Sequence, residues 1–337
     1  MDIILKLKEE LKVEKWQVEA AVKLIDEGNT IPFISRYRKE ATGSLNDEQL
    51  RNLHERLTYL RNLEEKKEQV IGSIEEQGKL TEELKNKILA AETLVVVEDL
   101  YRPYRPKRKT RASVAKEKGL EGLAQYILSQ DAKEPLETEA AKYINEEKEV
   151  KDEKEALQGA KDIIAESISD EADYRIYIRN ITMEEGTITS TAKDEKAESV
   201  YEMYYDYEEP VKKAAGHRIL ALNRGENEKF LAVKIVAPTE RILQYLAKKT
   251  ITSDNEYTTP LLQEVIEDAY ERLIAPAIER EIRNELTEKA EDGAISVFGK
   301  NLEQLLMQPP ITGKVVLGWD PAFRTGCKLA VVDETGK

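Results

Sequence analysis

The chain has 337 residues, of which 40% are apolar and 35% charged, and its formal net charge is −14. This composition favours long surface helices over a compact α/β enzyme. One cysteine, Cys327, and two histidines exclude a disulfide framework, a multi-cysteine zinc site and a histidine-rich metal cage. The start lacks the apolar core of a signal peptide, and no run approaches the length of a membrane span. We expect a cytoplasmic protein with no membrane contact and no cofactor.

The beginning of the chain is predicted to be helical. Apolar residues in 1–30 recur mainly at helical intervals, and Gly28 provides a stop. The segment 30–39 follows, in which Pro32 suits the first turn of a short helix.

The longest helix is expected to start after Asn46. Gln49, three residues later, completes a pattern typical of a capping box. An apolar stripe, mostly leucine, then continues until Gly78. Another short helix is predicted to begin near Thr81.

Residues 101–118 form the main break in composition, with eight basic residues and one acidic residue. Pro103 and Pro106 disfavour a continuous helix and favour an extended path. We expect the helix to resume at about 112–128.

The central part of the sequence mixes helices with a few short strands. Residues 131–156 are rich in Glu and Lys and are predicted to be a solvated connector, and helical periodicity resumes in 152–168. A strand is predicted over 230–236. Residues 259–290 are typical of one long helix, or of two, with an interruption near Pro276.

The period changes after the Pro309–Pro310 boundary. Two short apolar runs, 315–317 and 327–332, flank a turn and predict a β-hairpin. Two strands with buried-looking faces do not make a stable sheet alone, so we expect the natural protein to continue.

Four separated motifs together resemble the Tex family of transcription accessory proteins. They are Gly28–Glu40, Asp99–Lys107, Arg272–Asn284 and Gly318–Lys328, in the family's order, and the resemblance covers essentially the whole chain. One departure is Ala322, which stands where a glycine is common.

The resemblance implies a mainly α fold: a multi-helix scaffold with helix-turn-helix-like parts, a few short strands, and the first β-hairpin of a YqgF-type, RNase H-like domain. The expected regions are 1–185 (amino-terminal helical), 186–312 (central helical with short strands) and 313–337 (start of the RNase H-like domain). It also implies helix-hairpin-helix motifs and an RNA-binding OB-fold domain, both absent from this sequence.

The strongest candidate for nucleic-acid binding is the basic segment, whose cations are Arg102, Arg105, Lys107, Arg108, Lys109 and Arg111. Such a cluster can neutralise several phosphates, and Tyr101 and Tyr104 can offer stacking faces to unpaired bases. The alternative is structural: Tyr and Pro pack against helices while the cations pair with the abundant glutamates. The residues leave both interpretations open, with the structural one slightly favoured.

A second basic cluster consists of Arg36, Arg38 and Lys39. On a helix Arg36 and Lys39 are neighbours, whereas Arg38 points elsewhere. Because the flanking residues are apolar, an arginine buried in an ion-pair network is favoured over contact with nucleic acid.

No catalytic residue is predicted. By the resemblance, Asp320 marks the vestigial metal position of an RNase H-like site, but such chemistry needs several carboxylates around two cations. Asp333 is expected at the opposite end of the hairpin, so the remaining carboxylates would come from sequence absent here. His54 is expected to be a surface or groove-lining residue, and a structural hydrogen bond is favoured for His217. Cys327 is expected to be a small apolar filler on a buried-looking strand.

The favoured interpretation is a non-catalytic scaffold in transcription, binding RNA, DNA or both, with RNA binding expected of the full-length protein. RNA polymerase or the ribosome are the candidate protein partners. Two alternatives remain open. One is a metal-dependent RNase H-like nuclease that needs further sequence, and the other is a pure protein-interaction module.

Overall fold

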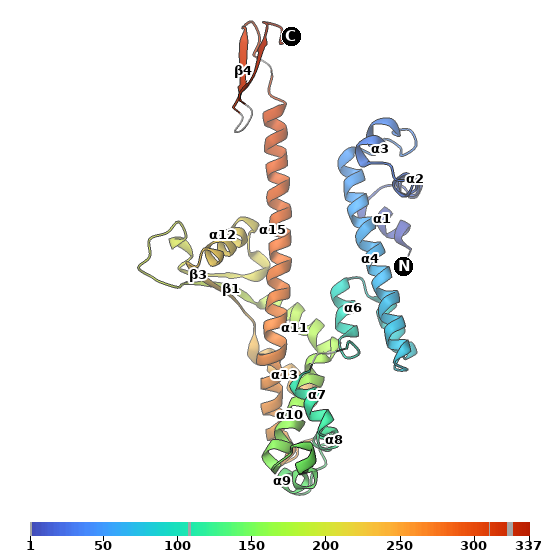
Figure 1. Cartoon of the computed structure of the whole chain (residues 1–337), viewed down its shortest axis with the longest axis vertical. Coiled ribbons are helices and arrows are strands. Elements are labelled where there is room, and N and C mark those ends of the chain that lie inside the picture. The colour runs from blue at the N-terminus through green and yellow to red at the C-terminus, as the bar shows by residue number, and fades with distance from the viewer. Residues whose placement is uncertain (1, 107–108, 310, 322–325) are drawn as a thin grey trace. The chain divides into compact units, whose positions relative to one another are not determined.

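A computed structural model describes residues 2–106, 109–309, 311–321 and 326–337. The fold is mainly helical with a few short strands, as predicted (Figure 1). The chain forms two compact units. The first unit comprises Met1–Glu184 and Ala237–Ile278, and the second comprises Glu185–Val236 and Glu279–Lys337. Each unit is therefore assembled from two stretches of chain, whereas the predicted regions follow one another along the sequence.

The amino-terminal helices form where the local sequence predicts them. They are α1 (Ile3–Leu11), α2 (Lys15–Asp26), α3 (Ile31–Tyr37) and α4 (Asp47–Glu76). Gly28 ends α2 with a positive φ of 83°, which a residue without a Cβ adopts readily. Pro32 lies in the first turn of α3, where its missing N–H costs no hydrogen bond.

The long helix α4 provides the surface on which the other amino-terminal helices pack. The predicted capping box is present: Asn46 accepts from the Gln49 backbone N–H at 2.8 Å, and Gln49 Oε1 accepts from the Asn46 N–H at 3.0 Å. The predicted apolar stripe is buried, at Leu50, Leu53, Leu57, Leu60, Leu63, Val70 and Ile74. Residues of α1, α2 and α3 complete the core around its first half.

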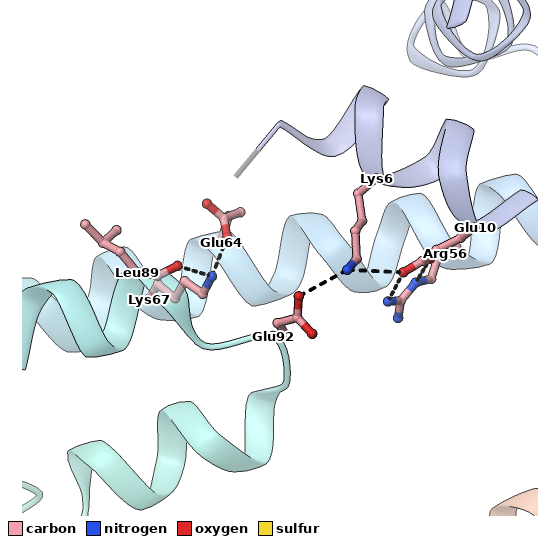
Figure 2. Close-up of polar contacts among 7 residues, drawn as sticks. All are labelled: Lys6, Glu10, Arg56, Glu64, Lys67, Leu89 and Glu92. Atoms are coloured by element: carbon pink, nitrogen blue, oxygen red, sulfur yellow. Dashed lines mark hydrogen bonds and ion pairs between the residues drawn. The ribbon is translucent and has the colours of Figure 1, made fainter. Parts of the chain in front are cut away.

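The second half of α4 holds α5 (Glu82–Ala90) and α6 (Leu94–Tyr101). Lys67, only 1% exposed, donates to Glu64 Oε1 at 2.8 Å and to the Leu89 carbonyl oxygen at 3.0 Å (Figure 2). The buried ammonium therefore ties the carboxyl end of α5 to α4, because it satisfies a carbonyl that the helix itself leaves unbonded.

A chain of surface ion pairs links α1 to α4 and to the connection between α5 and α6. Glu10 binds Arg56 through two contacts, of 2.6 and 2.8 Å, and Lys6 lies 3.2 Å from Glu92 (Figure 2). Hydrogen bonds from Arg56 hold the pKa of the Glu10 carboxyl below its ordinary value. These exposed pairs contribute little to stability individually, so the leucine stripe holds this part together.

The rest of the first unit is built around α10. Helix α10 spans Glu153–Asp170. The elements around it are α7 (Arg111–Glu117), α8 (Glu121–Ser129), α9 (Leu136–Ala140), the 3₁₀ turns η1 (Ala141–Tyr143) and η2 (Glu146–Lys148), α11 (Ala172–Glu185) and α13 (Thr239–Thr250). The helix predicted over 112–128 is two helices, because Gly119 turns the chain with a φ of 82°. The predicted solvated connector is wrong in part, since Leu136, Ala140 and Val150 are buried.

The predicted interruption near Pro276 takes the form of a π-helical turn. Helix α14 (Thr258–Asp268) continues through the π-helix η5 (Ala269–Ile274) into α15 (Ala275–Leu306). Proline has no N–H to donate to the carbonyl four residues earlier, and the wider π turn accommodates that loss.

The second unit contains a three-stranded antiparallel sheet of order β2-β1-β3, formed by β1 (Thr187–Ala192), β2 (Asp206–Pro210) and β3 (Leu231–Val236). The 3₁₀ turns η3 (Glu202–Tyr204) and η4 (Val211–Lys213) and helix α12 (Gly216–Asn227) complete it. Arg283 of α15 donates to Glu226 and Asn223 of α12, and to the Val233 carbonyl oxygen of β3. The predicted strand at 230–236 is confirmed.

The predicted carboxy-terminal hairpin is also confirmed. Strands β4 (Val316–Asp320) and β5 (Lys328–Val332) pair antiparallel, with Val316 opposite Val332 and Asp320 opposite Lys328. The turn residues 322–325 lie outside the described part of the chain. None of the described helices combines the length and apolarity that crossing a membrane requires.

Candidate nucleic-acid interface

The basic segment is anchored by a buried ion-pair cluster at its start. Asp99 of α6 is 3% exposed. Its Oδ1 accepts from Arg175 Nε and its Oδ2 from an Arg179 terminal nitrogen, each at 2.7 Å. Both arginines come from α11, one helical turn apart, so they meet the carboxylate from the same face. This cluster fixes the end of α6, three residues before Arg102.

The two tyrosines of the segment face the protein core. Tyr101 and Tyr104 pack against the apolar cluster of α4, α5 and α6, and the Tyr101 hydroxyl lies 2.9 Å from Ser73 Oγ. Both rings are half-buried, so the stacking faces suggested for them are covered in part. The backbone also differs from the extended path predicted for this segment. Tyr104 and Arg105 both donate to the Tyr101 carbonyl oxygen, so Pro103 lies in a turn that does not need its missing N–H.

Arg102, Arg105 and Lys109 line a hollow of about 630 Å³ together with three carboxylates, Glu98, Glu166 and Asp170. Arg105 is 67% exposed and lies 3.8 Å from Glu98, which Lys66 approaches more closely, at 2.6 Å. Cations and carboxylates are thus present in equal number around this hollow. The other two predicted cations, Lys107 and Arg108, lie outside the described residues.

Thr110 also lines a second hollow, in which the balance of cations and carboxylates differs. Lys109 and Arg111 are exposed and line this hollow, of about 410 Å³, between α7 and α10. Among the residues that the structure describes, neither side chain makes a hydrogen bond or an ion pair within 4.0 Å. These two cations are the part of the basic segment most available to a phosphate.

The second cluster of cations is at the surface, not in the core. Arg36, Arg38 and Lys39 are all exposed. Across the described ranges none of them has an ion-pair partner, so the favoured expectation of a buried arginine is wrong here. Arg38 lies over the Phe33 ring at 5.3 Å, and Phe33 contacts Tyr37 with ring centroids 5.4 Å apart. Among the residues that the structure describes, the fully buried arginine is Arg175.

Three family models match successive parts of this chain. The Tex-like protein N-terminal domain matches residues 1–75, the Tex central region matches 130–298, and the YqgF-like domain of Tex proteins matches 314–337. The chain belongs to the Tex family.

Similar full-length proteins extend this result. The chain is 54% identical, over 97% of its length, to the uncharacterized protein YdcI of Bacillus subtilis, and covers 46% of that protein. It is 40% identical, over its whole length, to the transcriptional accessory protein Tex of Neisseria gonorrhoeae, and covers 45% of it. With the human S1 RNA-binding domain-containing protein 1 the identity is 31%, over 35% of that protein. The chain thus spans about half the length, or less, of these relatives.

The Tex YqgF-like match places Asp320 in the first hairpin of that domain. Asp320 ends β4 opposite Lys328, whereas Asp333 follows Val332 at the other end of the hairpin, as expected. Hydrogen bonds from Thr335 lower the pKa of the Asp333 carboxyl, together with backbone donors of the closing turn, so this carboxylate acts as a local cap. Within the described ranges, no three His, Cys, Asp or Glu side chains form a group suited to a metal ion.

The remaining candidates of this Tex chain lie at the surface. His54 is exposed on α4, as expected, and His217 is exposed at the start of α12. The hydrogen bond expected of the His217 side chain is not among those of the described residues. Cys327 is exposed and precedes β5, so its expected burial is wrong.

Sequence reasoning missed the Asp99–Arg175–Arg179 cluster. A signal was present, because Asp99 follows Glu98 at the end of the apolar run from Leu94 to Val97, and a carboxylate in a buried helix requires a cation. The partner could not be named, because the two arginines lie 76 and 80 residues further along the chain.

Proposed function

We propose that this chain is a non-catalytic, nucleic-acid-associated scaffold of a transcription accessory protein, and that it contacts nucleic acid through the basic segment. The observation that carries the proposal is the pair Lys109 and Arg111, exposed and with no ion pair within 4.0 Å among the described residues, next to Thr110. In an acidic chain, two cations that no carboxylate contacts present a local positive potential to a phosphate.

The anchoring of the segment supports the same function. Asp99 and its two arginines fix one end, and the capping box between Thr110 and Ser113 fixes the other. A positively charged segment whose two ends are held in place loses less conformational entropy when it binds a phosphate backbone. The names of two relatives, the transcriptional accessory protein Tex and the S1 RNA-binding domain-containing protein 1, point to the same class of ligand for the full-length protein.

The proposal assigns no catalytic step to this chain. Metal-dependent RNase H-like chemistry needs carboxylates that converge on two cations. Asp320 and Asp333 lie at opposite ends of the hairpin, so they do not converge.

The test is binding of fluorescein-labelled single- and double-stranded RNA and DNA across a salt series. The Arg105→Glu/Arg111→Glu variant is compared with Lys116→Glu/Lys133→Glu, which changes the net charge equally at two exposed positions. We expect affinity to fall, and the dependence of log K on log salt to become shallower by about one to two, only in the first variant. Equal weak binding by both variants removes the basic segment from the proposal.

A second candidate is a protein-interaction module for RNA polymerase or the ribosome, favoured by the exposed rings of Trp16 and Tyr37, 53% and 68% exposed. Aromatic residues at the surface are enriched in protein interfaces. Pull-down with purified polymerase and ribosomes, using Tyr37→Ala and Arg36→Glu, tests it. Partner binding that is retained while nucleic-acid binding is absent at low salt would favour this candidate.

A further inference from the structure

The hollow of about 410 Å³ between α7 and α10 has the build of a small-ligand site. Its volume lies within the range of about 300–1,000 Å³ typical of ligand pockets. Its floor is apolar, formed by Val114, Ala115 and Leu120, while Gln158 is an exposed polar residue of the lining. An apolar floor bordered by polar side chains suits a planar, partly polar ring.

The floor is held in place by close packing. A Cβ at Gly159 would lie 2.3 Å from Leu120 Cδ1 and 3.2 Å from Ala115 Cβ, so a side chain here would force Leu120 to move and α10 to shift from α7. Nearby, Lys118 donates to Glu155 Oε1 and to the Glu149 carbonyl oxygen, each at 2.8 Å. The hollow therefore lies between two helices that are already fixed.

The charges of the lining are compensated on one side only. Glu155 is paired with Lys118, and Asp162 with Arg272 at 3.3 Å. Lys109 and Arg111 have no comparable contact partner among the described residues, although Arg111 lies within electrostatic range of Asp268. The lining thus combines an apolar floor, engaged carboxylates and two cations that remain available for an anion.

We propose that this cavity binds one nucleotide unit, with the base on the Val114–Leu120 floor and the phosphate beside Lys109 and Arg111. The inference rests on the proposed function and deepens it by naming the ligand unit and its pocket. A nucleotide combines a flat, weakly polar ring with an anion, and the lining likewise combines an apolar floor with two cations. The 630 Å³ hollow on the other side of Lys109 fits this ligand less well, because its carboxylates equal its cations in number.

The nucleotide has two sources, a free mononucleotide or one residue of an RNA or DNA strand, and titrations separate them. AMP, CMP, GMP and UMP are titrated calorimetrically into the whole chain, with adenosine and inorganic phosphate as partial ligands. Fluorescein-labelled ten-residue oligo(rU), oligo(rA) and oligo(dT) are followed by anisotropy. Because base and phosphate both contribute, we expect a mononucleotide or an oligonucleotide to bind more tightly than adenosine or phosphate.

Two variants with matched controls test the pocket. Val114→Phe fills the floor, and Val95→Phe makes the same change at an exposed position of α6, 43% exposed. Lys109→Gln/Arg111→Gln removes the phosphate contacts, and Lys116→Gln/Lys133→Gln is the control, which removes two exposed cations outside the lining. We expect each pocket variant to weaken binding about tenfold or more, because one loses charged contacts to the phosphate and the other fills the space for the base, and the controls to bind as the parent chain does.

The outcomes separate the pocket from the proposed function. If oligonucleotide binding is lost in Lys109→Gln/Arg111→Gln and unchanged in a folded Val114→Phe, the pocket proposal is overturned while the proposed function stands. Mononucleotide binding that the pocket variants abolish, without oligonucleotide binding at low salt, supports the pocket and overturns the proposed function. If neither probe binds the parent chain, both are overturned. Thermal unfolding confirms that Val114→Phe folds, and the charge variant tests the pocket without filling its floor.

Discussion

Replacing Arg175 with methionine removes a fully buried cation and leaves the Asp99 carboxylate with Arg179 as its remaining guanidinium partner. Arg175 has no exposed side-chain surface and Asp99 has 4%, with a contact of 2.7 Å between them. Breaking a buried ion pair on one side costs about 3–5 kcal/mol, because the remaining charge stays away from water. Since Arg179 still contacts Asp99 Oδ2 at 2.7 Å, we expect a loss near the lower end, about 3 kcal/mol.

The chain provides a control of similar geometry and different burial. Arg61 and Asp26 also pair at 2.7 Å, but their side chains are 46% and 47% exposed. Exposed pairs are worth about 1 kcal/mol or less, so Arg61→Met is expected to lower the free energy of unfolding by no more than that. The difference between the two variants then measures what burial adds to the same contact.

Urea unfolding followed by circular dichroism gives the two free energies. Hydrogen–deuterium exchange locates the loss, which we expect in α6 and α11 for Arg175→Met and in α2 and α4 for Arg61→Met. The reasoning is refuted if Arg175→Met costs no more than Arg61→Met, or if exchange in α6 and α11 is unchanged. Because Asp99 anchors the basic segment, Arg175→Met should also weaken oligonucleotide binding, which Arg61→Met should leave intact.

Three further predictions concern other parts of the first unit. Lys67→Met should cost about 1–3 kcal/mol, the usual effect of leaving buried acceptors unsatisfied, and should raise hydrogen exchange in α5 but not in α7. Gly43→Ala should lower the free energy of unfolding by about 1–3 kcal/mol, because the Gly43 φ is +63° and a Cβ would lie 2.5 Å from the Trp16 ring. The fluorescence of Trp16 in a Trp319→Phe background measures this unfolding. Hydrogen bonds from Arg272 lower the pKa of the Asp268 carboxyl below 3.8. Its contribution to stability is therefore present above that value and lost as the pH falls through the lowered pKa. Asp268→Asn should flatten the fall of the urea midpoint between about pH 4.5 and about pH 2.5.

Sequence signals near the ends of the helices predicted the helix boundaries well, because a capping residue or a glycine stop acts on backbone groups within four residues of itself. The Asn46–Gln49 box, Pro32 in a first turn and the glycine stops at Gly28 and Gly78 all lie where expected. The basic segment was less predictable. The prolines indicated an extended path, but a proline disrupts a turn only where its N–H is needed, and the turn at 101–105 uses the N–H groups of Tyr104 and Arg105 instead.

The candidate interface was found from the sequence in outline only. The cations at 102–111 were recognised by composition, but composition cannot tell which of them face a carboxylate. Arg105 shares Glu98 with Lys66, whereas Lys109 and Arg111 line a different hollow. The prediction for Arg36 and Arg38 failed for the same reason, since apolar neighbours indicate burial only when another element covers them.

The sequence by itself determined the family, the mainly helical fold, the capped long helix and the carboxy-terminal hairpin. These depend on residues close together in the chain, whose backbone hydrogen bonds and apolar periods are local. Only the tertiary structure decided which charges are buried, paired or available. Asp99 meets Arg175 from 76 residues away, and Gly159 brings α10 against α7 to form the pocket beside Arg111. The free energy of a charge depends on its solvent exposure and on distant partners, and neither is fixed by neighbours in the sequence.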